Sequence, residues 1–195
     1  QMHNKGNYII SLSDFTKWLA QQAEELDVEI YPGFSASEVL YDENNKVVGI
    51  ATCDMGRLKD GSEGPNFERG IELRAKQTVF SEGCRGHLGK TLMEKFELNS
   101  NNSPQTYGIG IKELWEVTPE NSKPGSIMHT TGWPLDNETY GGSFLYHLDD
   151  NKISIGFVIG LDYKNPYLSP YLEFQRFKHH PAIKELLEGG RRINY

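Results

Sequence analysis

Residues 139–148 read TYGGSFLYHL, and this stretch decides the fold of the second half of the chain. From residue 142 onward, alternate positions fall on opposite sides, so that Phe144 and Tyr146 share one face, as in a half-buried strand. Gly141 and Gly142 lie inside this pattern, although glycine weakens a strand and usually marks a bend or a point of close approach by another molecule. The stretch therefore predicts a sheet strand whose backbone is accessible near its beginning.

The flanking sequence predicts partners for this strand. Similar runs lie on both sides of it and are separated by turn-forming residues such as Asp149, Asp150 and Asn151. Together they predict an antiparallel sheet of about four strands, large enough to cover or line a pocket. The strands are expected at residues 106–114, 127–133, 140–148 and 152–161, and two helices should follow at 171–179 and 181–187.

The first half of the chain has a different character. Residues 11–26 carry apolar side chains at helical spacing, with Ser11 or Ser13 available as the N-cap. A short strand should follow this helix at 28–31. A small antiparallel meander is then expected, with strands at 37–41, 46–52 and 71–75 and a polar loop at 59–66. The fold class is therefore α/β, with a mixture of helices, a meander and an antiparallel sheet.

Residues 78–90, TVFSEGCRGHLGK, form the second informative stretch. A short apolar strand is expected at 78–80, followed by three glycines and a helix on which Leu88, Leu92 and Phe96 share a face. A glycine turn between a strand and a helix can point backbone N–H groups at an anion. The spacing is not the Gly-x-Gly-x-x-Gly of a dinucleotide fingerprint, so a tight structural turn is favoured over an anion site.

Composition limits the classes of function. A chain of 195 residues with 37% hydrophobic content can bury a substantial core. Its 27 acidic and 20 basic residues give a net charge of −7. The sequence has no run of Lys or Arg interleaved with aromatic residues, which argues against binding of nucleic acid. No apolar stretch is long enough to cross a bilayer. The first residue is Gln1 rather than Met, so we expect a piece of a longer protein.

Few side chains suggest a metal or an acid-base site. Cys53 and Cys84 are the two cysteines, and without metal-ligand spacing they are expected to be free structural thiols. His179 and His180 are adjacent, which suits a solvated helix end better than a metal site. His147 could donate a hydrogen bond to a ligand oxygen, or it could be a structural histidine. No arrangement of Ser, His and Asp, and no pair of carboxylates, indicates hydrolytic chemistry.

Aromatic residues gather in the second half of the chain. They could line a pocket for a planar ligand or could form ordinary sheet core. These residues are Phe144, Tyr146, Phe157, Tyr163, Tyr167 and Tyr171. Together with the glycine turn, the pattern fits a flavoprotein in which an antiparallel sheet caps the substrate.

Short runs spread along nearly the whole chain are more specific. They are GNYI at 6–9, AEEL at 23–26, YPG at 31–33, FSEGC at 80–84, GHL at 86–88, PQTYGIG at 104–110, GWPL at 132–135, YGGSFLYH at 140–147, GLDY at 160–163, NPY at 165–167, FQR at 174–176, KHHP at 178–181 and LEGG at 187–190. Through these runs the chain resembles the electron transfer flavoprotein–ubiquinone oxidoreductase family.

The resemblance implies an oxidoreductase with FAD and a 4Fe-4S cluster, which passes electrons from reduced electron transfer flavoprotein to ubiquinone. It implies a location on the matrix side of the mitochondrial inner membrane, or at the bacterial cytoplasmic membrane, with monotopic contact to the membrane surface. Gly141 and Gly142 match the family's glycine pair that contacts the quinone. Glu82 and Gly83 resemble an acidic-residue-glycine motif near the FAD, and Ala36 lies where the strand backbone of related flavoproteins meets the adenine. No catalytic acid, base or nucleophile is implied.

The resemblance also implies a domain organisation. Residues 1–98 would be part of a glutathione-reductase-type, hydroxylase-like FAD domain, 99–180 the ubiquinone-binding sheet domain, and 181–195 a return toward the FAD domain. The family's dinucleotide fingerprint, second flavin motif and cluster cysteines have no match, so the segment alone should be inactive. The alternatives are an aromatic hydroxylase-like monooxygenase, a prenyl-lipid reductase, or a non-enzymatic binding module that uses a pocket in the sheet.

Overall fold

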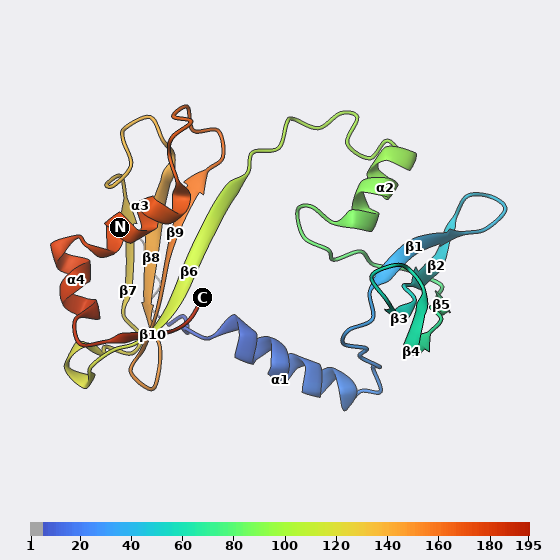
Figure 1. Cartoon of the computed structure of the whole chain (residues 1–195), viewed down its shortest axis with the longest axis horizontal. Coiled ribbons are helices and arrows are strands. Elements are labelled where there is room, and N and C mark those ends of the chain that lie inside the picture. Colours follow the sequence, from blue (N-terminus) through green and yellow to red (C-terminus); the bar gives the residue numbers. More distant parts are fainter. Residues whose placement is uncertain (1–5) are drawn as a thin grey trace. The chain divides into compact units, whose positions relative to one another are not determined.

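The computed structural model describes residues 6–195, which divide into two compact units (Figure 1). One unit comprises residues 6–22 and 104–195, and the other comprises residues 23–103. Each unit has a hydrophobic cluster of its own. Among the described residues, no helix combines the length and the apolar character needed to cross a membrane.

The larger unit is built on a five-stranded antiparallel sheet in the order β10-β6-β9-β8-β7 (Figure 1). The strands are β6 Gly108–Glu116, β7 Ile127–Thr131, β8 Gly141–His147, β9 Lys152–Gly160 and β10 Arg191–Asn194. The four predicted strands are confirmed. The fifth, β10, was not predicted, because its sequence RRIN carries too few apolar residues to show a strand pattern, and pairing with β6 creates the strand.

The two faces of this sheet differ, as the alternation in β8 predicted. The odd-numbered residues 143, 145 and 147 of β8 are buried. Gly141 and the even-numbered residues of this strand are half-buried. On the buried face, Leu145, Ile155 and Phe157 pack against the helices α3 Pro170–Lys178 and α4 Pro181–Leu187. We call this helix-covered side the inner face and the opposite side the outer face. A short 3-10 helix, η1 Pro119–Asn121, lies between β6 and β7.

Both helices on the inner face were predicted, and local sequence explains where α3 begins. Ser169 is the N-cap of α3, and its Oγ accepts a hydrogen bond from the backbone N–H of Leu172 at 3.4 Å. Pro170 follows at the first helical position, where proline leaves no hydrogen bond unmade. Phe174 and Phe177 then reach the sheet and are almost completely buried.

The predicted N-terminal helix is confirmed as α1 Leu12–Glu24. Ser11 is the residue that caps it, because its Oγ accepts from the backbone N–H of Asp14 at 3.3 Å. The short strand predicted at 28–31 is wrong. Those residues have an apolar pattern, but a strand exists only through a paired neighbour, and within the described part of the chain none pairs with them.

The smaller unit contains the predicted meander, as a sheet in the order β1-β2-β5. Its strands are β1 Ala36–Tyr41, β2 Val47–Thr52 and β5 Glu72–Arg74. The predicted polar loop at 59–66 is partly wrong, because β3 Met55–Arg57 and β4 Glu63–Glu68 pair there as a hairpin. Helix α2 His87–Lys95 is confirmed and buries Leu88 and Leu92 beside Val39. The strand predicted at 78–80 is wrong, because no strand in the described part of the chain pairs with these residues.

Candidate functional site

The glycine pair lies at the beginning of β8, between two other strands. Gly141 pairs with Ile159 of β9, while Gly142 pairs with both Val158 of β9 and Thr131 of β7. Both glycines are half-buried. Strand β9 therefore lies beside both glycines, and β7 also lies beside Gly142 on its other side.

The fold itself requires glycine at both positions. A Cβ atom at Gly141 would lie 2.5 Å from the Cδ1 of Leu135 and 2.5 Å from the carbonyl O of Val158. A Cβ atom at Gly142 would overlap the carbonyl O of Thr130. Packing therefore gives a sufficient structural reason for the pair, independent of any ligand.

Farther along β8, aromatic side chains cover the outer face. The rings of Phe144 and Tyr146 are stacked with centroids 5.1 Å apart, and the ring of Phe144 lies over the backbone of Gly156. The hydroxyl of Tyr146 and the Nε2 of His129 are 3.0 Å apart, within hydrogen-bond distance. This aromatic group borders a cavity of about 500 Å³ that is also lined by residues 10–14 and by Lys112.

The predicted aromatic cluster is thus divided between different surroundings. Phe157 is part of the inner-face core, stacked near Phe174, whereas Phe144 and Tyr146 belong to the outer face. Tyr167 and Tyr171 are exposed. The six residues therefore do not form one pocket.

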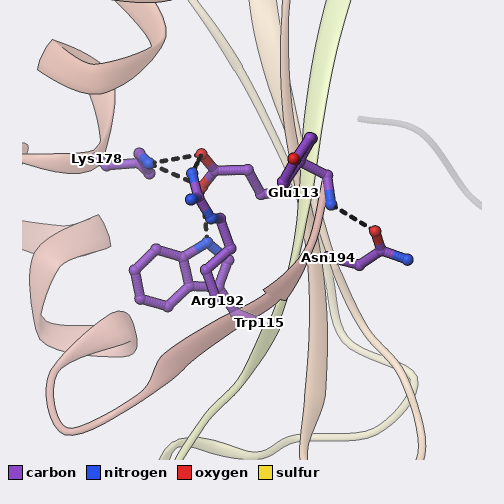
Figure 2. Close-up of polar contacts among 6 residues, drawn as sticks. Glu113, Trp115, Lys178, Arg192 and Asn194 are labelled. Atoms are coloured by element: carbon purple, nitrogen blue, oxygen red, sulfur yellow. Dashed lines mark hydrogen bonds and ion pairs between the residues drawn. The ribbon is translucent and has the colours of Figure 1, made fainter.

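Opposite the aromatic group, on the inner face, a buried carboxylate connects three elements (Figure 2). Glu113 of β6 is 2% exposed, and both of its carboxylate oxygens accept hydrogen bonds from the Nζ of Lys178 of α3, at 2.7 and 3.0 Å. The indole N–H of Trp115 donates to it at 2.8 Å, and a guanidinium N–H of Arg192 of β10 donates at 3.3 Å. Charge-assisted hydrogen bonds of this kind fix the register of β6 against α3 and β10.

The surroundings of Glu113 also set its protonation state. Burial alone raises the pKa of this carboxyl, but the hydrogen bonds from Lys178, Trp115 and Arg192 and the charge of Lys178 outweigh that effect. The pKa of Glu113 therefore lies below its ordinary value. The residue stays ionised and has a structural role.

His147 lies at the opposite end of β8 from the glycine pair. Its side chain is 4% exposed, and its Nδ1 accepts a hydrogen bond from the backbone N–H of Lys123 at 3.2 Å. Burial, followed by the positive charge of Lys123, lowers the pKa of His147. These contacts favour the structural role for this histidine over a ligand contact.

The remaining candidate metal ligands are scattered. His179 is the C-cap of α3, and the ring of His180 lies 5.3 Å from that of Trp133. Cys53 and Cys84 are free and exposed, not buried as free cysteines usually are. Across residues 6–195, no group of three or more His, Cys, Asp or Glu side chains is placed to bind a metal ion.

In the smaller unit, Glu82 occupies the anion position that the glycine turn was expected to create. Its carboxylate accepts hydrogen bonds from the backbone N–H groups of Leu88 at 3.2 Å and Gly89 at 2.6 Å, in the first turn of α2. A negative charge at this end of the helix is also favoured by the helix dipole. Gly86 makes room for the Glu82 side chain, which a Cβ atom there would contact at 2.6 Å.

The other predicted flavin contacts lie in the same unit. Gly83 has a φ of +77°, which favours glycine, and a Cβ there would have no neighbour within 4 Å. Ala36 is half-buried at the beginning of β1 and pairs with Thr52. The backbone of Gly83 is therefore open to its surroundings. A cofactor phosphate does not fit at Leu88 and Gly89, because Glu82 already binds their N–H groups.

The sequence did not single out a second group of glycines, Gly108 and Gly110 of β6. Gly110 and Gly142 pair with Val158 from opposite sides, so the larger unit brings residues from three strands together. Among the residues of β9, Val158 is the exposed one, at 37%. The Gly-Ile-Gly spacing of residues 108–110 was visible in the sequence, but only strand register shows that it lies beside Val158.

Comparison with known proteins gives three kinds of likeness. Residues 107–195 match the family model described as ETF-QO, ubiquinone-binding. The whole chain is 58% identical to the mitochondrial electron transfer flavoprotein-ubiquinone oxidoreductase of Sus scrofa, covering 32% of that relative. It is 57% identical to the protein of the same name from Pseudomonas aeruginosa, covering 35% of it, and 57% identical to the mitochondrial one of Dictyostelium discoideum, covering 32%.

The solved structure of the flavin-dependent brominase Bmp2 resembles the chain with a TM-score of 0.61 at 18% identity, over 97% of this chain and 43% of the brominase. At that identity the likeness concerns the fold, which is mixed α/β with antiparallel sheets. The chain spans about a third of the length of the curated relatives that it matches.

Proposed function

We propose that the protein containing this chain is an electron transfer flavoprotein–ubiquinone oxidoreductase, which passes electrons from reduced electron transfer flavoprotein to ubiquinone. The observation that carries this proposal is the identity of 57–58% along the entire chain to relatives of that name from a mammal, a bacterium and a slime mould. Since the chain spans only a third of those relatives, the activity is proposed for the longer protein.

Within this chain, we propose that the larger unit carries the site for the ubiquinone head group, at Gly141 and Gly142. The match of residues 107–195 to a ubiquinone-binding family supports this assignment. Both glycines remain partly exposed although β9 pairs with both of them and β7 pairs with Gly142. A planar head group could therefore contact their backbone without a side chain in between.

We propose that the smaller unit contributes to FAD binding through Glu82, Gly83 and Ala36. FAD would supply the reversible uptake of electrons, and this chain would supply binding and orientation. Glu82 would act by holding the turn at the N-terminus of α2, which leaves the backbone of Gly83 open. The ligands of a 4Fe-4S cluster would come from other parts of the longer protein, because Cys53 and Cys84 supply at most two.

The domain assignment follows from the same proposal. Residues 1–98 would belong to a glutathione-reductase-type, hydroxylase-like FAD domain and 99–180 to the ubiquinone-binding domain. Residues 181–195 would lead back toward the FAD domain by way of β10. The protein would act on the matrix side of the mitochondrial inner membrane, or at the bacterial cytoplasmic membrane, with monotopic contact to the membrane surface.

The test uses the full-length protein that contains this chain. Purified protein should show flavin absorbance in the visible range and the spectroscopic signature of an iron–sulfur cluster. With reduced electron transfer flavoprotein as donor, it should reduce a short-chain ubiquinone catalytically. Omitting the donor, or replacing it with NADPH, should abolish quinone reduction.

Different results would point to the alternatives. NADPH-dependent oxygen consumption with hydroxylation of an aromatic substrate would indicate a monooxygenase, and reduction of a prenyl chain would indicate a prenyl-lipid reductase. A complete protein without flavin would indicate a binding module. Each of these results contradicts the proposed electron transfer to ubiquinone.

A further inference from the structure

Val158 has an unusual environment for a residue of a central strand. Strand β9 has β6 on one side and β8 on the other, and the odd-numbered residues of β9 on the inner face are at most 1% exposed. Val158 lies on the outer face and is 37% exposed. Its lateral partners are Gly110 and Gly142, so no side chain shields it from either side. The apolar side chain of Val158 therefore lies between two residues that have no side chain.

The fold requires one of these two glycines and not the other. A Cβ atom at Gly142 would overlap the carbonyl O of Thr130, whereas a Cβ atom at Gly110 would meet only the Cγ2 of Val158, at 3.6 Å, an ordinary van der Waals contact. The φ of Gly110 is also not in the left-handed region. Alanine would fit there and would be better in a strand than glycine.

Gly108, on the same face, repeats this pattern. A Cβ atom there would lie 3.5 Å from the Cγ1 of Val158 and 3.5 Å from the carbonyl O of Ile159, with no overlap. Gly108 and Gly110 thus have no side chain, although the packing leaves room for one at each position. Glycine that packing does not need is typical of a place where another molecule approaches the backbone.

We infer that Val158 and Gly110 contact the ubiquinone head group and extend its site from Gly142 across β9 to β6. This inference rests on the proposed function. Neighbouring strands are about 4.8 Å apart, so three of them provide a surface about 10 Å wide, enough for a single ring to lie flat. The methyl groups of Val158 supply the apolar contact, and the bare backbone at Gly110 and Gly142 lets the ring approach on both sides.

The head group is favoured as the occupant by continuity and by the family match. Gly110, Val158 and Gly142 lie side by side in register, so a ring that contacts Gly142 adjoins Val158 directly. All three residues fall within residues 107–195, which match the ubiquinone-binding family. On the outer face of β8, the ring of Phe144 begins two residues after Gly142 and bounds the surface on one side.

The experiment uses the full-length holoenzyme, with a short-chain ubiquinone as the probe. In the Gly110→Val variant, a branched side chain suited to a strand fills the space beside Val158. The KM for the quinone should rise about tenfold, because the site loses a close contact with the ring. The FAD content, the flavin spectrum and the rate of flavin reduction by reduced electron transfer flavoprotein should not change.

A matched control separates this effect from a general disturbance of the sheet. Ser154→Val adds a similar side chain to the outer face of β9, four residues from Val158, beside Leu114 and Tyr146. Its KM for the quinone should stay at the wild-type value. Should Gly110→Val fail to fold, Gly110→Ala, whose Cβ has room, should raise the KM about threefold.

Three results would contradict the inference or its premise. An unchanged KM in folded Gly110→Val, with wild-type protein reducing ubiquinone normally, would overturn the inference and leave the proposed function intact. A changed flavin spectrum or a loss of FAD with an unchanged KM would assign the surface to the flavin ring and would also overturn it. Failure of the wild-type holoenzyme to reduce ubiquinone would refute the proposed function, and the inference with it.

Discussion

Glu113 and Lys178, 65 residues apart in the sequence, form a buried ion pair in which the lysine donates to both carboxylate oxygens at 2.7 and 3.0 Å (Figure 2). The pair joins the middle of β6 to the last turn of α3. Gly110 lies three residues before Glu113 on the same strand. The ion pair therefore helps to hold in place the strand that carries part of the proposed quinone site.

Removing the lysine should destabilise the larger unit. Lys178→Met leaves the 2% exposed carboxylate of Glu113 with only Trp115 and Arg192 as partners. Loss of one partner of a buried charge pair should lower the free energy of unfolding by about 3 kcal/mol. Urea denaturation of the full-length protein, followed by tryptophan fluorescence, measures the change.

An exposed ion pair offers the control for this variant. Lys164 and Glu138 are 3.0 Å apart, and their side chains are 81% and 70% exposed. Lys164→Met should change the stability by no more than about 0.5 kcal/mol, because solvent screens such pairs. Equal effects of the two substitutions would show that burial of Glu113 does not govern its contribution.

His147 should make stability depend on pH. Its pKa is lowered in the folded state, so its contribution is fully present above the unfolded value of about 6.5 and is lost as the pH falls toward the folded value. Below pH 6.5 the stability should fall by at most about 1.4 kcal/mol per pH unit from this group. Denaturation midpoints at several pH values between 7.5 and 5.5 measure the slope.

Two variants assign that slope to His147. His147→Asn cannot be protonated, so its stability should vary less over the same interval. Lys123→Gln removes the charge that contributes to the lowered pKa, so it should also reduce the slope. A wild-type slope retained in His147→Asn would assign the pH dependence to other groups.

Replacement by alanine should change the stability of the larger unit differently at Gly142 and at Gly110. Gly142→Ala forces a Cβ atom against the carbonyl O of Thr130 and should destabilise the larger unit by about 2 kcal/mol. Gly110→Ala meets only Val158 at 3.6 Å and should be neutral or slightly stabilising. Thermal unfolding of both variants compares them, and a similar loss in both would contradict the steric distinction.

Glu82 should stabilise the beginning of α2. Glu82→Ala removes the acceptor of the N–H groups of Leu88 and Gly89, and the helix should lose about 1 kcal/mol. Hydrogen exchange at these two amides should accelerate. Glu94→Ala, at an exposed position near the end of the helix, should leave their exchange unchanged. Protection that persists in Glu82→Ala would show that the carboxylate does not bind them in solution.

The sequence predicted the elements that carry a clear local signal. Alternation identified β6 to β9, and helical spacing with Ser11 or Ser13 available as a cap identified α1. The sequence predictions failed where strand formation depends on pairing with a distant segment. Residues 28–31 and 78–80 have the composition of strands, but no residue within 6–195 pairs with them. The sequence of β10 lacks a strand pattern, but it pairs with β6.

For the candidate site, the sequence by itself determined the candidate residues, namely the glycines at 141 and 142 and the turn at Glu82 and Gly83. It also determined the resemblance to the family. Only the tertiary structure decided why they are there. Register brings Thr130 and Val158 against the glycine pair, and folding of the turn brings Glu82 onto the first turn of α2. The physical reason is that a missing side chain has meaning only relative to the atoms that would contact it, and these atoms come from distant parts of the chain.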